Sequence, residues 1–550
     1  MTQNLPEDLK QIINGDVLSD DQTLSMYSHD ASLFEVKPQV VVFPKDIKDL
    51  KALVKYVNDN KKKNSSLSIT ARSAGTDMGG GSINDSIIVE FGKYFNHTPQ
   101  INDNTATTEP GVFYRDFEKE TLKHNLLFPS YPASREICAM GGILSNNSGG
   151  EKSLQYGKTE KYVKKMKIVL SDGNIYEFKK LSETELKEKM SLKTFEGEIY
   201  KKIYNLIVDN YDEIVKAKPN VTKNSAGYYL WNIYNKEEKT FDLTQLFVGA
   251  QGTLGLLAEA DIQLVPTHRH REMIIIFLHD LSRLGEIIDL VLPFQPESFE
   301  SYDDNTLKLS LRYFPEFAQK LGIGGLIQSG LAFLPAFLQM FIGKLPKLIL
   351  QIDFTGNDLD ELKQKIETLR EKLKPLHPQI RIAIDDQEKR YWLVRRESFN
   401  LLRNKIRNKH TAPFIDDFVI NPHQTAETLP RIVAILKKHP EFIFTVAGHI
   451  GNGNFHIIPL VDITDKKVRE AIPIVAEQVY DIITKNKGSI TGEHNDGLIR
   501  TPYLPKMYEP KIISLFEETK KIFDPNNIFN PRKKVFGDLN FAMKHIRQAW

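Results

Sequence analysis

The chain has 550 residues and a mass of 63.0 kDa, more than one hydrophobic core ordinarily serves, so we expect two or three domains. Its net charge of +2 gives no field that would attract nucleic acid. The single cysteine, Cys138, excludes an internal disulfide and any cysteine-rich zinc or iron–sulfur site, and it suits a reducing compartment. Residues 1–20 lack the basic-then-apolar pattern of a targeting peptide, so we expect a cytoplasmic protein.

The first half of the chain alternates short strands with helices. After a helical lead-in over residues 1–35, a helix is expected over residues 47–58, because Pro44 to Asp46 mark its start and its apolar residues recur at helical spacing. Runs of β-prone residues predict strands at residues 39–43, 68–70, 87–91 and 262–266. The alternation indicates an α/β or α+β domain over residues 36–268.

The second half reads as a separate α+β domain over residues 269–485. We expect its strands at residues 273–278, 288–292, 348–354 and 380–384, and a helix at residues 359–373. Further helices are expected at residues 469–484 and 510–523. Residues 486–535 form a C-terminal segment, and a tail follows over residues 536–550.

Residues 321–343 contain no charged side chain, although Lys320 and Lys344 flank them. The stretch is about long enough to span a bilayer as a helix, but its five glycines and Pro335 argue against a simple span. Two interpretations stay open. The segment is either an apolar hairpin that dips into a membrane surface, or an element covered by this protein or a partner.

Residues 448–456 combine a hairpin signal with two histidines. Asn452-Gly453 lies between two apolar, β-prone runs, and this dipeptide accepts the positive φ angles of a tight turn. A turn centred there places His449 directly opposite His456, with Cβ atoms about 4.5–5.5 Å apart. The pair could share one divalent ion, or the hairpin could hold two unrelated histidines.

Three glycine-rich runs each lie near strand-like sequence: residues 71–82, 141–150 and 249–255. Glycines let backbone N–H groups approach an anion closely, which is how a diphosphate can be cradled. The first run lacks both the P-loop ending and the Rossmann spacing, so neither of those nucleotide-binding motifs fits it. By itself each run could also be only a turn.

In order along the chain, the three runs and Tyr156-Gly157 resemble the FAD-cradling segments of the vanillyl-alcohol-oxidase/PCMH-type flavoprotein family. The second half resembles the D-lactate / D-2-hydroxy-acid dehydrogenase (glycolate oxidase subunit-like) branch of that family. The matching segments are residues 392–397, 449–456, 491–494 and 523–531. The fold expected from the resemblance is α+β: a two-part PCMH-type FAD-binding domain, a substrate (cap) domain and a C-terminal helical segment.

The resemblance also implies functional residues. Those expected to bind FAD are Arg72, Ser73, Ala74, Gly75, Thr76, Gly79, Gly80, Gly141, Gly142, Asn146, Ser148, Gly149, Gly252, Thr253, Gly255 and Asn530. A divalent metal, Zn or Mn, is expected on His449, His456 and Glu493, which would leave coordination positions open for substrate. His494 is the expected base, and Arg396 is expected to clamp the substrate carboxylate. A surface ion pair of Arg396 with Glu397 or Asp386 is the alternative.

Several positions depart from the family pattern. The first glycine-rich run offers no histidine for covalent attachment, so FAD is expected to bind non-covalently. Asn452 stands where the family usually has aspartate, which removes a charge near the metal, and Asn495 replaces a usual glycine after the expected base. Ile415 and Ile458 appear at positions where relatives that use 2-hydroxyglutarate present polar groups, which favours a lactate-like substrate.

The expected activity is oxidation of a D-2-hydroxy acid, most simply D-lactate, by hydride transfer to the flavin. The alternatives are an oxidase or synthase of another class, such as one for an alditol or alkylglycerone phosphate, and a non-catalytic electron-relay subunit. With no iron–sulfur cluster, electrons must leave to a quinone, a cytochrome, another electron-transfer protein or oxygen. The basic amphipathic residues 541–550 and residues 321–343 suggest peripheral contact with the inner face of a membrane.

Overall fold

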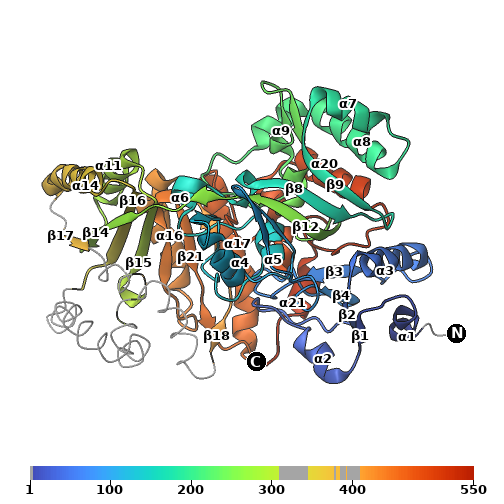
Figure 1. The fold of residues 1–550 in the computed structure, drawn as a ribbon. Helices are drawn as coiled ribbons and strands as arrows, with labels where there is room; N and C mark the ends of the chain where they lie inside the picture. The colour runs from blue at the N-terminus through green and yellow to red at the C-terminus, as the bar shows by residue number, and fades with distance from the viewer. Residues whose placement is uncertain are drawn as a thin grey trace.

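The computed structural model describes residues 4–306, 308, 345–376, 379–383, 392 and 409–549. Arg396 and residues 321–343 therefore lie outside the described residues, and Trp392 alone is described in the 392–397 motif. The described chain contains three main sheets with helices packed around them, as the α+β class requires (Figure 1).

The first sheet has the order β1-β2-β4-β3, in which β2, β4 and β3 run parallel. The strands are β1 (Asp16–Leu18), β2 (Val40–Phe43), β3 (Ile69–Arg72) and β4 (Ile87–Glu90). Helix α3 (Ile47–Asn60) lies between β2 and β3. Its expected apolar positions from Leu50 to Val57 are buried, and Asp46 caps it by accepting from the amides of Lys48 and Asp49.

The helical lead-in expected over residues 1–35 also contains a short strand. Helices α1 (Leu5–Lys10) and α2 (Asp21–Met26) are present, but β1 lies between them and pairs antiparallel with β2. A strand of three residues is too short to show an alternating pattern in the sequence.

The second sheet is antiparallel, with the order β10-β11-β9-β8-β12-β6-β5. Its strands are β5 (Gln100–Asn102), β6 (Thr105–Thr108), β8 (Val163–Val169), β9 (Ile175–Ser182), β10 (Tyr234–Asn235), β11 (Thr240–Asp242) and β12 (Leu256–Gln263). The strand expected at residues 262–266 comprises the end of β12 and the short β13 (Val265–Pro266), which pairs with β7 (Leu126–Leu127). Helices in this part are α4 (Tyr114–Leu122), α5 (Met140–Asn146), α6 (Ser153–Tyr156), α7 (Glu183–Ser191), α8 (Phe195–Asp209), α9 (Tyr211–Ala217) and α10 (Thr244–Phe247).

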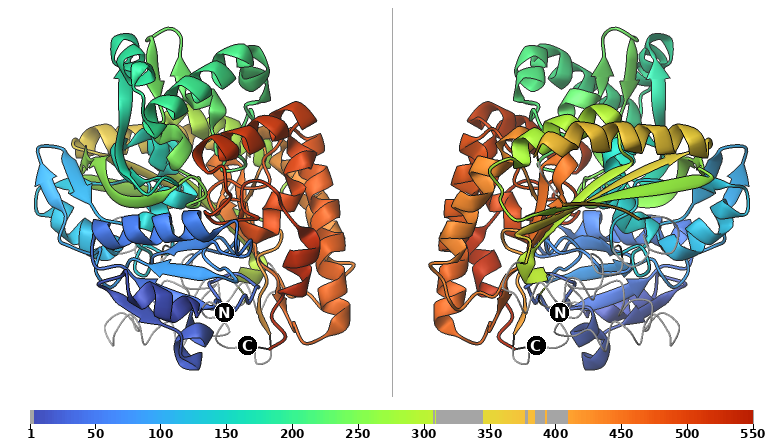
Figure 2. Two further views of the ribbon diagram at one scale, coloured as in Figure 1. Left: turned by 90° about the vertical axis from the view of Figure 1, so that its right-hand side faces the viewer. Right: turned by 90° about the vertical axis from the view of Figure 1, so that its left-hand side faces the viewer.

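The third sheet has the order β17-β14-β16-β15-β20-β21-β19. Its strands are β14 (His270–Leu278), β15 (Ser298–Asp303), β16 (Leu348–Gly356), β17 (Gln379–Ala383), β19 (Phe418–Val419), β20 (Val446–His449) and β21 (Asn454–Ile457). Helices α11 (Leu284–Val291) and α14 (Leu359–Leu373) lie across one face of this sheet (Figure 2). Strands β18 (His410–Thr411) and β22 (Leu460–Val461) pair with each other in a separate two-stranded sheet.

The strand expected at residues 288–292 was wrong, because residues 288–291 belong to helix α11 and Leu292 begins the 3₁₀ helix that follows it. Its buried residues Leu284, Ile287, Ile288 and Val291 follow the i, i+3, i+4, i+7 spacing of an amphipathic helix. Taken alone, residues 288–292 resemble a strand because they include β-branched residues. The helical spacing becomes apparent only when Leu284 is considered with them.

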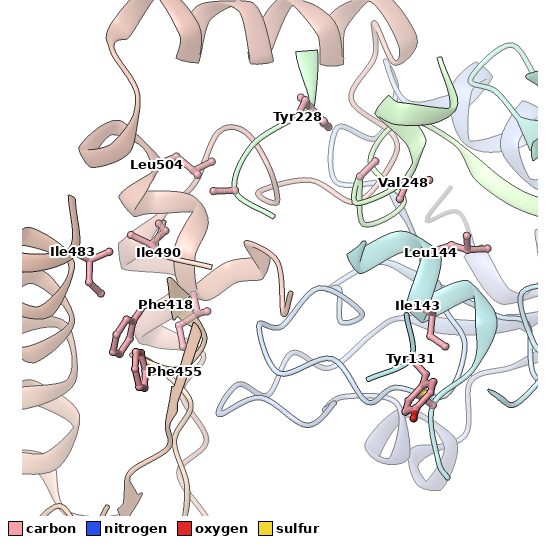
Figure 3. Packing of buried hydrophobic residues seen from close by; sticks show 14 of the residues in the cluster. Tyr131, Ile143, Leu144, Tyr228, Val248, Phe418, Phe455, Ile483, Ile490 and Leu504 are labelled. Carbon is pink, nitrogen blue, oxygen red and sulfur yellow. The ribbon is translucent and has the colours of Figure 1, made fainter. Parts of the chain in front are cut away.

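The C-terminal part brings the end of the chain back to the first sheet. Helices α16 (Thr425–Leu436), α17 (Lys466–Lys485), α18 (Gly497–Arg500), α19 (Leu504–Met507) and α20 (Pro510–Phe523) lead to it. After α20, Ile69 N donates to Ile528 O (2.7 Å), and Asn530 N donates to Ile69 O (2.8 Å). One apolar cluster joins the two halves, with Tyr131 and Ile143 at one end and the stacked rings of Phe418 and Phe455 at the other (Figure 3).

The described part of the tail, residues 541–549, packs partly against the protein. Helix α21 (Leu539–Lys544) buries Ala542, and Ile546 beyond it is also buried. Arg547 is 8% exposed and donates from Nε to Phe34 O (3.1 Å) and from Nη2 to Asp30 O (2.7 Å). No helix in the described part of the chain is long and apolar enough to cross a membrane.

These contacts predict that Arg547→Ala destabilises the protein. The variant loses two hydrogen bonds from a buried charged donor, so we expect the free energy of unfolding to fall by about 2–3 kcal/mol. Urea denaturation followed by circular dichroism measures the change, with Lys544→Ala, which removes an exposed side chain on α21, as the matched control. Equal denaturation midpoints for the two variants would contradict the prediction.

Candidate functional site

A cavity of about 1450 Å³ opens between the glycine-rich runs and the hairpin of β20 and β21. This volume exceeds the roughly 300–1000 Å³ of a pocket for a drug-sized ligand. Most of the residues expected to bind a cofactor or substrate line it, together with Ile458: Ser73, Ala74, Gly75, Thr76, Gly141, Gly142, Asn146, Ser148, Gly149, Gly252, Gly255, His449, His456, Glu493 and His494.

The first glycine-rich run leaves β3 and presents backbone donors to the cavity. Among the described residues, the amides of residues 73–77 have no protein acceptor, which suits a turn that binds an anion. Asp77 fixes the turn: Oδ1 accepts from the amides of Gly79 (2.7 Å) and Gly81 (2.8 Å). Its Oδ2 accepts from Asn146 Nδ2 (2.9 Å) and Gln251 Nε2 (3.3 Å), so one carboxylate joins all three runs.

The second run forms α5 and the loop that follows it. A Cβ at Gly142 would meet no atom within 4 Å, so this backbone borders open space in the cavity, as a surface pressed against a flat ligand must. At Gly149 a Cβ would lie 2.7 Å from Ser153 Oγ and 3.0 Å from Glu493 Oε2. Glycine there lets the cradle, which is formed by the three glycine-rich runs, approach the carboxylate of Glu493.

Five residues expected at the cofactor do not line the cavity: Arg72, Gly79, Gly80, Thr253 and Asn530. Three of them make side-chain hydrogen bonds to backbone carbonyls. Arg72 Nη1 donates to His29 O (2.8 Å), and Thr253 Oγ1 donates to Ala250 O (2.7 Å). Asn530 Nδ2 donates to Gly81 O (2.8 Å) and Gln251 O (2.6 Å), which ties the first run to the third.

The hairpin register differs from the expectation by two residues. His449 pairs with Asn454 and Ala447 pairs with His456, because residues 450–452 form a 3₁₀ turn and Gly453 follows with φ of 64°. The expected two-residue turn was therefore wrong. A shift of two keeps every side chain on its face of the sheet, whereas a shift of one would have separated the histidines.

His449, His456 and Glu493 converge on one point. His449 Nε2 and His456 Nε2 each lie 3.3 Å from Glu493 Oε1, and the ring centroids of the two histidines are 5.2 Å apart. All three side chains are largely buried. The two imidazole nitrogens and the carboxylate oxygen that both of them face are donor atoms of the kinds that bind a divalent metal such as zinc.

A carboxylate lies behind each histidine. His449 Nδ1 lies 2.6 Å from Glu300 Oε1 on β15, and His456 Nδ1 lies 3.1 Å from Asp416 Oδ1. A carboxylate can only accept, so each Nδ1 donates and each Nε2 is left facing Glu493. Burial alone would lower the pKa of His456, but Asp416 and Glu493 outweigh it and raise that pKa to about 10. The two carboxylates therefore favour a positive charge on His456.

His494 lies beside the convergence point. Its ring stacks on that of His456 with centroids 5.1 Å apart, and its Nδ1 lies 2.6 Å from Asp416 Oδ2. Burial opposes a charge on His494, but Asp416 and Asp417 raise its pKa above the usual value. Because Asp416 occupies the Nδ1 side, Nε2 is the atom available to a substrate.

Four groups of the site were missed in the sequence: Glu300, Asp416, Asp417 and Lys223. The acidic pair at 416 and 417 follows an apolar run, but nothing in its spacing relates it to His456 or His494. Asp417 could join a ligand set with His456, Glu493 and His494 by distance alone. Its Oδ2, however, already accepts from the backbone amides of residues 492–494, and its Oδ1 accepts from Asn454 Nδ2. Ile458 lines the cavity, whereas Ile415 is fully buried and does not line it.

Two protein-family models match the chain. Residues 38–179 match the FAD binding domain, and residues 267–534 match the C-terminal domain of FAD linked oxidases. This chain belongs to the FAD-linked oxidases. The α+β fold class expected from the resemblance is confirmed, since the FAD-linked oxidase aligns with 4-ethylphenol oxidase from Gulosibacter chungangensis over 98% of both chains (TM-score 0.69, 16% identity). Its alignment with p-cresol methylhydroxylase has a TM-score of 0.66 at 16% identity.

Curated relatives of the FAD-linked oxidase carry several names. It is 25% identical to D-2-hydroxyglutarate dehydrogenase of Haemophilus influenzae over 95% of this chain and 50% of the relative. It is 24% identical to the glycolate oxidase subunit GlcD of Bacillus subtilis, with 98% of both chains covered. It is 25% identical to D-lactate dehydrogenase of Anaerostipes hadrus, with 97% of both chains covered. The chain spans about half the length of the first of these relatives.

Asp303, the last residue of β15, should make the stability of the protein depend on pH. Asp303 accepts from Thr306 N (2.9 Å) and from Val446 N (3.1 Å) at the start of β20, yet burial raises its pKa to about 6. Its stabilising contribution is complete below about pH 4 and is lost as the pH rises through about 6. Between pH 4.5 and pH 7.5 we therefore expect wild type to lose about 2 kcal/mol relative to Asp303→Asn.

Urea denaturation of both proteins at the two pH values measures this difference. Asp59→Asn, at an exposed carboxylate, is the control, and it should follow wild type. A constant difference between wild type and Asp303→Asn would show that Asp303 does not titrate in this range.

Proposed function

We propose that this FAD-linked oxidase is a dehydrogenase that oxidises a D-2-hydroxy acid to the 2-oxo acid. The observation that carries the proposal is the convergence of His449, His456 and Glu493, with His494 beside them, in the same cavity as the glycine-rich cradle. The names of its relatives, which include dehydrogenases of D-2-hydroxyglutarate and D-lactate, agree with this chemistry.

The residues present fit both groups that the reaction needs. Residues 73–77 and 141–149 would hold non-covalent FAD, which supplies the hydride acceptor when it is bound. His449, His456 and Glu493 would hold Zn²⁺ or Mn²⁺, which supplies a Lewis acid for the substrate oxygens. The fit rests on free backbone donors at the first turn and on a nitrogen and oxygen donor set surrounded by carboxylates.

The side chains of the protein would then handle the proton. His494 takes the proton of the substrate hydroxyl at Nε2, while Asp416 holds its Nδ1 and stabilises the imidazolium that forms. Hydride leaves C2 as the hydroxyl proton leaves its oxygen, which yields the 2-oxo acid. Arg396 is proposed as the clamp for the substrate carboxylate, although it lies outside the described residues.

Ile458 in the lining favours a short or apolar substrate side chain, so we propose D-lactate ahead of D-2-hydroxyglutarate. Electrons would pass on to a separate quinone, cytochrome or electron-transfer protein. A flavin subunit without catalysis, or an oxidase of alditols, has no need of two buried histidines converging on a glutamate, and no observation favours either.

We predict that D-lactate bleaches the flavin of the purified protein under anaerobic conditions. The expected result is reduction by D-lactate, slower reduction by D-2-hydroxyglutarate and none by L-lactate, because a fixed binding mode presents one face of C2. Stopped-flow absorbance of the bound flavin measures the three rates. Absence of bleaching by every 2-hydroxy acid, with Zn²⁺ or Mn²⁺ supplied, would overturn the proposal.

We also predict that His456→Ala abolishes metal binding but not FAD binding. Removing a direct ligand should lower turnover by more than the roughly 10–100-fold that loss of a supporting residue costs. Metal content by elemental analysis and the flavin spectrum report the two groups separately. His439→Ala is the control, since His439 bonds Glu441 and stacks on Phe442 outside the cavity lining. Full turnover by His456→Ala without bound metal would contradict the metal assignment.

A further inference from the structure

Lys223 is a buried lysine to which neither the FAD cradle nor the proton transfer gives a role. It lies in the loop after α9 and is 2% exposed. Its Nζ donates to Glu493 Oε2 (3.2 Å) and Asn454 Oδ1 (3.2 Å) and lies 3.5 Å from Gly150 O. Burying an ammonium group costs several kcal/mol unless it is well paired, so the position of Lys223 calls for an explanation.

The contacts of Glu493 divide its carboxylate into two ends. Oε1 faces the Nε2 atoms of His449 and His456 at 3.3 Å each, while Oε2 faces Lys223. Gly149 closes the side of Oε2, since a Cβ there would lie 3.0 Å from that oxygen. Lys223 and His449 also hold the pKa of Glu493 well below its usual value, against the effect of burial.

Lys223 also connects three parts of the chain at this point. It comes from the half that carries the cradle, Asn454 comes from the hairpin, and Glu493 comes from the C-terminal segment. Asn454 pairs with His449 in the hairpin register and donates from Nδ2 to Asp417 Oδ1 (3.0 Å). The ammonium group therefore connects Glu493 to the hairpin, whose Asn454 also contacts Asp417, the carboxylate that anchors the loop of Glu493.

We propose that Lys223 is a positioning residue for the cation site. By holding Oε2 of Glu493, it leaves one oxygen of this carboxylate to face the two imidazoles. A cation held there would keep coordination positions for the hydroxyl and carboxylate oxygens of a 2-hydroxy acid. The inference rests on the proposed function, because it concerns the same cation.

Two effects of Lys223 on the cation have opposite signs. Its charge repels a nearby cation, whereas its hydrogen bonds preorganise the glutamate ligand. Methionine at 223 removes both the charge and the donors, and glutamine removes the charge but keeps a donor. Comparing Lys223→Met with Lys223→Gln therefore separates positioning from charge repulsion.

The experiment measures the affinity of the FAD-loaded protein for Zn²⁺ by competition with a chelator. For Lys223→Met we expect a loss of about 10–100-fold, the usual effect of removing a residue that orients a metal ligand. Lys223→Gln should bind Zn²⁺ more tightly than Lys223→Met. If the methionine variant does not fold, the affinity of Lys223→Gln is compared with that of wild type instead. Lys533→Met is the matched control, because Lys533 is also 2% exposed and donates to Ile83 O, away from Glu493.

Affinity equal to or tighter than wild type in Lys223→Met would overturn the inference, and so would an equal loss in Lys533→Met. Either result leaves the proposed function standing, provided that wild type binds Zn²⁺ and the flavin is bleached by a 2-hydroxy acid. Absence of Zn²⁺ binding by wild type would overturn the positioning role and the metal assignment together, while the bleaching experiment decides separately on the oxidation of 2-hydroxy acids.

Discussion

The carboxylate of Asp417 holds the loop on which the rest of the site depends. Its Oδ2 accepts from Thr491 Oγ1 (2.7 Å) and from the backbone amides of Gly492 (2.9 Å), Glu493 (2.8 Å) and His494 (2.7 Å). Three successive amides can point at one atom only if the loop curls around it, and left without an acceptor in this buried position each would cost about 1–3 kcal/mol. The curl lets adjacent residues, Glu493 and His494, serve one site.

Asp416 and Asp417 divide two tasks between neighbouring carboxylates. Asp417 bonds to backbone and orders the loop, whereas Asp416 contacts His456 and His494. Neighbouring residues of an extended strand would point to opposite faces, but Asp417 has φ of 67° and breaks that alternation. A left-handed backbone costs about 1–2 kcal/mol for a residue other than glycine, and here the hydrogen bonds to Asp417 offset it.

The parts of the fold that were predictable from the sequence are those set by local rules. Helices α3 and α14 follow from the aspartates that cap them and from apolar residues at helical spacing. Part of helix α11 was expected to be a strand, because the helical spacing of its apolar residues is recognisable only when Leu284 is included. The hairpin register required the conformation of residues 450–452, and the role of Asp416 required two contacts over 40 and 78 residues of sequence. Long-range pairing leaves no mark on a local pattern.

Asn495 shows how a departure from a sequence pattern can preserve a structure. Its φ is 67°, which explains why glycine suits this position, and asparagine tolerates the same left-handed conformation. Its side chain also does what glycine could not, since Nδ2 donates to Gly249 O (2.8 Å) and Asn146 O (3.2 Å). Those carbonyls belong to the third and second glycine-rich runs. The residue after His494 thus ties the loop that carries Glu493 and His494 directly to the glycine-rich runs.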